Sequence, residues 1–245
     1  MNIKTPHLKA LAAVVCIALP GLAPHAAISL DRTRIVFDGD KKSVSLNIRN
    51  DNKEMPYLAQ SWIENEQQQK VTAPIIVLPP LQRVEPDTGG QVKLLKTPEA
   101  EQLPKDRESL FYFNLREVPP RTETSNTMQI ALQTKIKLFY RPQEITPGRN
   151  IVWQERLIVS KVSGGFQVEN PTPYYVTIID LQDVSDKKSE SNFEPVMLAP
   201  FSSSTLEPEA RNIKHPVIGY INDYGGYQKL NYTCEKTLCS FKSTK

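Results

Sequence analysis

The sequence predicts an all-β protein made of two immunoglobulin-like β-sandwich domains. The chain carries 20 prolines among its 245 residues and few long runs of helix-forming residues. It contains instead many short segments in which apolar and polar residues alternate, which is the pattern of half-buried strands. Clusters of Asp, Asn, Gly and Pro separate these segments, as expected for turns. Together these observations favour two sandwiches over a helical or mixed fold.

Residues 1–26 precede the expected strands and read as a secretory signal peptide. Lys4 and Lys9 lie near the start, an apolar run follows over residues 10–19, and small residues lead to Ala26, after which we expect cleavage. The apolar run is too short to cross a bilayer, and no other segment is apolar enough to do so. We therefore expect a soluble, exported product without membrane insertion. Losing the two lysines lowers the formal net charge of +3 to about +1.

Seven strands are predicted in the first domain, which we place at residues 27–142. Their apolar residues recur at every second position, as Val44, Leu46 and Ile48 do. Turn signals such as Asp-Gly-Asp at 38–40 and Pro-Asp-Thr-Gly-Gly at 86–90 separate them. Seven short strands over about 115 residues are typical of one immunoglobulin-like sandwich. The expected strands are 33–37, 43–48, 57–64, 75–78, 91–95, 110–116 and 128–140.

The last of these strands, 128–140, has two unlike faces. Met128, Ile130, Leu132 and Ile136 fall on one face, and glutamine and lysine side chains occupy the other. Inside a closed sheet the apolar row faces the core. At a sheet edge the same strand is a template on which another chain can add a strand. Alternation alone leaves both possibilities open.

A polar stretch with two prolines follows, and we expect a hinge at 143–149 and a second domain at 150–245. The sequence Ser-Gly-Gly at 163–165 predicts a tight hairpin inside this domain. The expected strands are 153–162, 166–170, 174–181, 196–198, 204–206, 217–222 and 229–234.

Residues suited to chemistry are scarce. After Cys16 is removed with the signal peptide, Cys234 and Cys239 remain, and in an oxidising compartment we expect them to form a disulfide. The alternative is that the two thiolates are half of a zinc site, but no histidine lies nearby to complete it. His215 is the one histidine left after cleavage and is expected to be exposed and structural, so a catalytic triad has little to build on. No phosphate-binding loop is present. We expect no enzyme activity, no metal ion or other cofactor, and no nucleic-acid partner.

Residues 103–119, which read LPKDRESLFYFNLREVP, carry the most specific motif of the chain. This stretch resembles the signature of the periplasmic chaperones of the chaperone–usher pilus pathway. Further similarity spans nearly the whole chain after the signal peptide, at residues 29–34, 50–53, 136–142, 169–175 and 220–226. The resemblance implies two sandwiches arranged as an L with a cleft between them. It also implies a periplasmic protein that binds and caps pilus subunits (pilins and adhesin) by donor-strand complementation and delivers them to an outer-membrane usher.

Two sets of binding residues follow from the resemblance. Arg34 and Lys137 match the basic pair that holds the subunit's C-terminal carboxylate, for which a guanidinium and an ammonium group are suitable donors. Met128, Ile130 and Leu132 match the apolar row that is inserted into the subunit's open groove. An exposed row of this kind also gives the free protein a possible route to self-association.

Two structural features also follow from it. Glu108, Arg141 and Asp223 match a charged network that sets the angle between the domains, and Leu78-Pro79 matches a cis peptide bond. Two other classes of protein stay open. The first is a secreted immunoglobulin-like pilus subunit or adhesin, which should end in an alternating apolar motif, whereas this chain ends SFKSTK. The second is a periplasmic hydrolase, for which this chain lacks a nucleophile motif.

Overall fold

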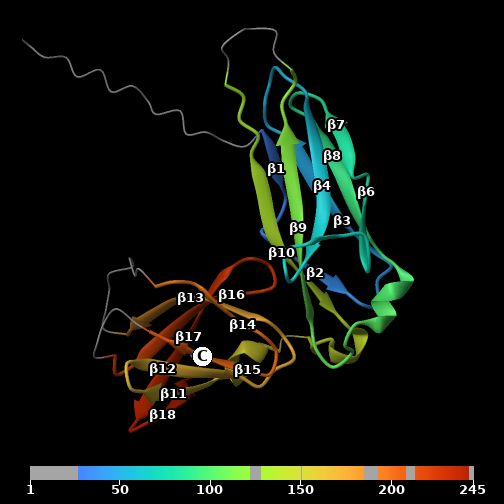
Figure 1. Ribbon diagram of the computed structural model, residues 1–245. Helices are drawn as coiled ribbons and strands as arrows, with labels where there is room; N and C mark the ends of the chain where they lie inside the picture. The colour runs from blue at the N-terminus through green and yellow to red at the C-terminus, as the bar shows by residue number, and fades with distance from the viewer. Residues whose placement is uncertain (1–26, 122–127, 150, 185–192, 208–212, 243–245) are drawn as a thin grey trace, which may run out of the picture.

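The computed structural model describes residues 27–121, 128–149, 151–184, 193–207 and 213–242. These residues form two β-rich lobes arranged as an L, which confirms the predicted fold class (Figure 1). The helices among them are three short 3₁₀ turns, η1 Pro98–Gln102, η2 Gln143–Ile145 and η3 Trp153–Arg156, and none is long and apolar enough to span a membrane. The expected signal peptide, residues 1–26, lies outside the described residues.

The N-terminal lobe is a sandwich of two sheets. One sheet has the order β1-β3-β8-β6; the other has the order β2-β10-β9-β4-β5, with β7 also paired to β4. Phe37, Leu46, Phe113 and Leu138 are fully buried between the two sheets. The strands are β1 Ile28–Leu30, β2 Arg34–Asp38, β3 Ser43–Asn50, β4 Tyr57–Asn65, β5 Lys70–Val71, β6 Ile75–Leu78, β7 Leu81–Val84, β8 Gly89–Lys96, β9 Ser109–Val118 and β10 Gln133–Arg141.

The start of β10 corrects the sequence prediction, which placed a strand over 128–140. β10 begins at Gln133, although the Leu132 carbonyl still accepts a hydrogen bond of 3.0 Å from the amide of Glu117. In the β9–β10 register, Gln133 lies opposite Arg116, so residues 129 and 130 would face Pro120 and Pro119. Proline has no N–H group to donate, so the ladder cannot extend past the bond between Glu117 and Leu132 to residue 130. Residues 128–132 therefore precede β10 without forming part of its strand.

The C-terminal lobe is built on eight paired strands in the order β14-β13-β16-β17-β18-β11-β12-β15. They wrap around a core that includes Trp153, Val159, Ile178 and Tyr232. The strands are β11 Ile158–Val162, β12 Gly165–Asn170, β13 Val176–Asp183, β14 Val196–Leu198, β15 Ser202–Leu206, β16 Pro216–Ile221, β17 Tyr227–Glu235 and β18 Leu238–Lys242.

Differences from prediction in this lobe lie at the ends of segments, apart from β18, which was not predicted at all. The segment predicted as one strand over 153–162 begins as η3, and the strand itself starts at Ile158. The predicted hairpin is present: Val162 pairs with Gly165, and Gly164 has a φ of +86°, which favours glycine. The strands β1, β5, β7 and β18 were not predicted.

Candidate functional site

Arg34 and Lys137 lie side by side at the junction of the two lobes. Arg34 is the first residue of β2, and the parallel β2–β10 ladder pairs it directly with Lys137. The Arg34 Nη1 atom donates a hydrogen bond of 3.2 Å to the carbonyl of Ile221, and the Lys137 Nζ atom lies 3.3 Å from the Thr177 hydroxyl oxygen. Thr177 and Ile221 are themselves paired across β13 and β16 in the other lobe. The paired residues Arg34 and Lys137 of one lobe therefore face the paired residues Thr177 and Ile221 of the other lobe across the junction.

The two cations are half-buried and incompletely bonded. Burial lowers the pKa of Lys137, and the adjacent Arg34 charge lowers it further. Burial also lowers the pKa of Arg34, and the charge of Asp223 opposes this change. The Nε atom of Arg34 is buried without a hydrogen-bond partner, and neither cation forms an ion pair within the described residues. Two desolvated positive charges with unused donors suit a carboxylate group.

The apolar row that leads to this pair becomes progressively more exposed. The exposed fraction is 8% at Ile136, 36% at Leu132, 65% at Ile130 and 86% at Met128. All four have even residue numbers, and Leu138, next in the series, is fully buried. The face of β10 that forms the core of the sandwich therefore runs outward into solvent.

The same region also has an open backbone edge. β9 pairs with β10 from Gln133 onward on one side, but β2 covers the other side over Lys137–Arg141 alone. Within the described residues, the backbone of residues 133–136 has no strand on that second side. The first residue of β2 at the end of this open edge is Arg34. An additional strand laid along the edge would lie in line with β2 and end at Arg34 and Lys137.

A buried ion network joins the lobes behind this pair. The Arg141 guanidinium contacts the Glu108 carboxylate at 2.6 Å and the Asp223 carboxylate at 2.8 Å. The second oxygen of Glu108 accepts a hydrogen bond of 2.8 Å from the amide of Tyr175, and the guanidinium lies over the ring of Tyr174 at 4.9 Å. Burial raises the pKa of Glu108 to about 7, opposed by the charge of Arg141 and by the Tyr175 amide. Residues from both lobes complete the network, so it depends on their relative position.

Contacts that sequence reasoning missed extend the junction. The rings of Phe139 and Tyr175 stack with their centroids 5.6 Å apart, and the Arg107 guanidinium lies 5.1 Å from the ring of Phe201. Phe201 has a φ of +54°, an uncommon conformation for a bulky residue. The sequence offered one indication of these contacts, the aromatic pair Tyr174-Tyr175 in the motif at 169–175. No local pattern indicated which residues of the other lobe this pair would contact.

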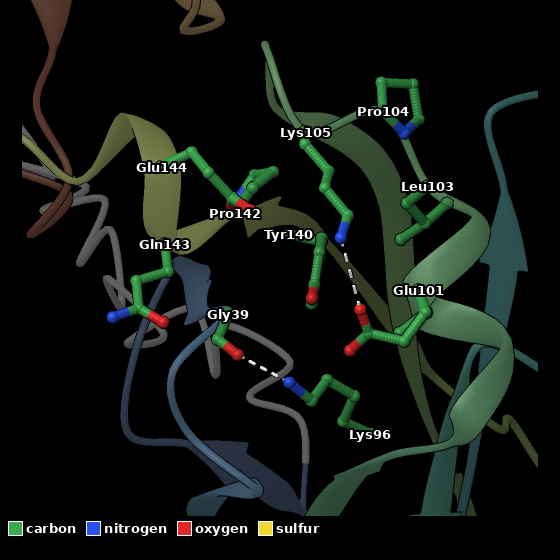
Figure 2. Close-up of a pocket in the computed structure, with 11 residues that line it drawn as sticks. Gly39, Lys96, Glu101, Leu103, Pro104, Lys105, Tyr140, Pro142, Gln143 and Glu144 are labelled. Atoms are coloured by element: carbon green, nitrogen blue, oxygen red, sulfur yellow. Dashed lines mark hydrogen bonds and ion pairs between the residues drawn. The ribbon is translucent and has the colours of Figure 1, made fainter.

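A hollow beside the segment that links the two lobes contains charged residues but lacks the features of the Arg34–Lys137 pair. It is lined by residues of η1, the following loop and η2, and Tyr140 reaches into it (Figure 2). The Lys96 Nζ atom donates a hydrogen bond of 2.5 Å to the carbonyl of Gly39, and Lys105 lies 3.5 Å from Glu101 (Figure 2). Because Lys96 and Lys105 already have partners within the hollow, it is a weaker candidate for a ligand site than the Arg34–Lys137 pair.

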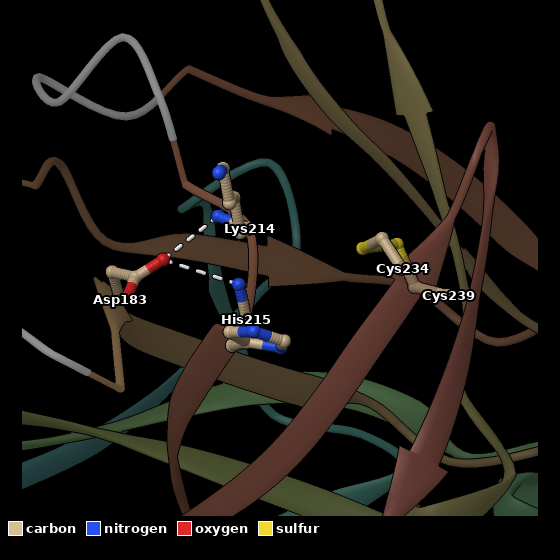
Figure 3. The surroundings of a disulfide bond; sticks show 5 residues. All are labelled: Asp183, Lys214, His215, Cys234 and Cys239. Atoms are coloured by element: carbon tan, nitrogen blue, oxygen red, sulfur yellow. Dashed lines mark hydrogen bonds between the residues drawn. A yellow bond between two sulfur atoms is a disulfide. The ribbon is translucent and has the colours of Figure 1, made fainter.

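The structure contains a disulfide between Cys234 and Cys239, which joins the paired ends of β17 and β18 (Figure 3). His215 is exposed, and its amide and that of Lys214 donate hydrogen bonds of 3.1 and 2.7 Å to an Asp183 carboxylate oxygen (Figure 3). Among the described residues, no group of three or more His, Cys, Asp or Glu side chains is arranged to hold a metal ion. Leu78-Pro79 has a cis peptide bond, as does Ala73-Pro74.

Comparisons with known proteins agree with this architecture. The family model "Pili and flagellar-assembly chaperone, PapD N-terminal domain" matches residues 27–146, and "Pili assembly chaperone PapD, C-terminal domain" matches residues 152–232. The chain is 57% identical over 221 residues to the chaperone protein PapD of Escherichia coli, covering 90% of this chain and 92% of that protein.

Solved structures give the same assignment. The periplasmic chaperone SfaE is 29% identical, with a TM-score of 0.67, over 83% of this chain and 98% of its own. The SafB chaperone structure, solved with the SafA pilin from Salmonella enterica, gives a match with a TM-score of 0.73 and 25% identity over 86% of this chain and 98% of the matched chain. These matches favour a chaperone over a pilus subunit, an adhesin or a hydrolase. The chain belongs to the PapD family of pilus-assembly chaperones.

Proposed function

We propose that this protein is a periplasmic chaperone that completes the fold of pilus subunits by donor-strand complementation, caps them, and delivers them to an outer-membrane usher. In this proposal residues 1–26 direct export, residues 27–142 form the subunit-binding domain, 143–149 the hinge, and 150–245 the second wall of the cleft. The related SfaE is described as a periplasmic chaperone, and SafB was solved with a pilin, which supports the location and the partner class.

The observation that carries the proposal is the alignment of three features along β10. An open backbone edge, an outward-facing apolar row and a pair of unpaired cations follow one another from Met128 to Lys137. A strand whose C-terminus reaches Arg34 must run in the direction of β10, as β2 does. The subunit's last strand is therefore expected to add parallel to β10, with its terminal carboxylate between Arg34 and Lys137.

The energetics divide between the two ends of this strand. Each apolar side chain that becomes fully buried in a subunit contributes about 1.5–3 kcal/mol before the costs of association. Charge-assisted hydrogen bonds to the carboxylate contribute about 1.5–3 kcal/mol each. The apolar row thus contributes affinity for an open groove, while the cations fix where the strand ends.

A pilus subunit from which the N-terminal extension has been deleted tests the proposal. Wild-type protein should form a stable one-to-one complex with it on size exclusion. Arg34→Ala and Lys137→Ala should each weaken binding by about 10- to 100-fold, because each removes donors to the carboxylate. Leu132→Glu should block the complex, because it would bury an unpaired carboxylate. All three variants should melt near the wild-type temperature.

Two substitutions serve as matched controls. Lys93→Ala removes an exposed cation from β8 in the opposite sheet, and Leu238→Glu places a carboxylate on an exposed leucine of the other lobe. Both should bind like wild type. Undiminished binding by Arg34→Ala, Lys137→Ala and Leu132→Glu together would rule out the proposed mode. Delivery is tested by adding usher-containing membranes to the purified complex, which should release free chaperone as the subunit is taken up.

A further inference from the structure

Tyr224 is the most exposed of the large hydrophobic side chains in the part of the chain that the structure describes, at 96%. It lies at the tip of the turn between β16 and β17, in the C-terminal lobe. A tyrosine ring is a large apolar surface that proteins usually cover at least in part. At this exposure, the whole ring is available to contact a partner.

The turn that carries Tyr224 is held by several hydrogen bonds. The side-chain oxygen of Asn222 accepts hydrogen bonds of 3.0 Å from the amide of Tyr224 and 2.9 Å from that of Gly226. The backbone of Asn222 makes two further bonds, its amide to the carbonyl of Gly226 at 2.9 Å and its carbonyl to the amide of Gly225 at 3.0 Å. The backbone that carries the ring is therefore held in a defined turn.

The same turn is seated on the N-terminal lobe beside the cationic pair. Gly225 has a φ of +81°, and a side chain there would collide with the hydroxyl of Thr33, the residue before Arg34. Tyr224 lines one hollow together with Arg34, Asp223 and Arg32. A strand that ends at Arg34 would bring its last residues next to this turn.

We infer that Tyr224 is a second contact for the C-terminal segment of the subunit, packing its ring against an apolar or aromatic side chain in the residues just before the terminal carboxylate. This inference rests on the proposed function. The inference adds a specificity determinant to the proposed function. Arg34 and Lys137 recognise the chain end, which every polypeptide has, whereas Tyr224 recognises the side chain beside that end. Tyrosine suits this role, because a rigid ring gives a large contact area and loses little conformational entropy on binding.

Peptide binding measured by calorimetry tests the inference. The probe is a synthetic peptide that copies the last strand of a pilus subunit, with a free C-terminal carboxylate. Tyr224→Ala should weaken its binding by about tenfold, and Tyr224→Phe should bind within about twofold of wild type, because the ring is retained. Leu238→Ala, which truncates a side chain exposed at 60% in the same lobe, is the matched control and should bind like wild type.

A second peptide separates direct packing from an indirect effect. It carries alanine in place of the apolar residue nearest the chain end. Wild-type protein should bind this peptide about tenfold more weakly, whereas Tyr224→Ala should bind both peptides equally, because the contact is already lost. Additive losses from the two changes would overturn the inference. So would a Tyr224→Ala variant that changes only the self-association of the free protein.

Failure of this inference is distinguishable from failure of the proposed function. Arg34→Ala and a C-terminally amidated peptide test the carboxylate anchor independently of Tyr224. If both weaken binding while Tyr224→Ala binds like wild type, the anchor stands and the role of Tyr224 is refuted. If wild-type protein does not distinguish the free acid from the amide, the anchor is wrong and the inference is overturned with it.

Discussion

Ile130 and Ile136 provide a matched pair for testing whether the apolar row serves a partner or the lobe's own core. Both are isoleucines with even residue numbers on one continuous stretch of chain. Their exposed fractions are 65% at Ile130 and 8% at Ile136. Truncating each to alanine removes the same atoms, so the difference between the two variants reports the environment.

The expected magnitudes follow from burial. Full burial of an isoleucine side chain is worth about 1.5–3 kcal/mol, so Ile130→Ala, with 65% of the side chain still in water, should cost the free protein about 0.5–1 kcal/mol. Ile136→Ala leaves a cavity in a packed core and should cost about 2–5 kcal/mol. When a subunit covers Ile130, the remaining area becomes buried, and losing it should weaken binding by about 5- to 30-fold.

Urea unfolding of the free protein and titration with the subunit measure both effects on the same samples. Ile136→Ala should lower the unfolding midpoint clearly, and Ile130→Ala should lower it little while weakening the complex. Equal destabilisation of the free protein by the two substitutions would mean that the row belongs to the lobe's own core. Unchanged subunit binding by Ile130→Ala would mean that the row does not contact the partner.

Three further predictions concern the junction of the lobes. At pH 8, Arg141→Ala should lower the free energy of unfolding by about 3–5 kcal/mol, because it leaves the Glu108 carboxylate buried without its partner; a loss below 1 kcal/mol would contradict this. Because the folded-state pKa of Glu108, about 7, lies above its usual value of 4.5, the folded protein binds the extra proton between these values, and stability should fall as pH rises through this window. Glu108→Gln should abolish that slope in urea titrations from pH 4.5 to 8, and an unchanged slope would assign it to other groups. Gly225→Ala should lower the melting temperature and weaken subunit binding, because the new methyl group collides with Thr33, whereas Gly164→Ala, at a positive φ with open space around it, should affect melting alone.

Local patterns determined several features of this protein by themselves. Alternation placed most of the strands, because side chains on a strand change face at every residue and a buried face must be apolar. The Ser-Gly pair at 163–164 was sufficient for a hairpin, because glycine there tolerates the positive φ that the turn requires. The cysteine pair near the C-terminus predicted a short covalent loop, and the motif at 103–119 indicated the family.

Other features depended on which segments become neighbours. β5, with two residues, and β1, with three, are too short to display a period. Pro119 and Pro120, which follow β9, have no N–H groups, so they stop the β9–β10 ladder from extending as far as residue 130. Only the register of β2 against β10 decides that the backbone of residues 133–136 keeps an open side and that this opening ends at Arg34.

The cleft residues illustrate the same division. The sequence by itself determined the residue types: a row of apolar side chains, two cations and a tyrosine between an aspartate and a glycine. It could not determine their exposure, because alternation reports the face on which a side chain lies and not what covers that face. The tertiary structure decided that Met128 and Ile130 extend past the end of the sandwich, that Thr177 and Ile221 approach the two cations from the other lobe, and that Tyr224 is held in solvent beside Arg34. Each of these depends on contacts between residues far apart in the chain, which local periodicity does not encode.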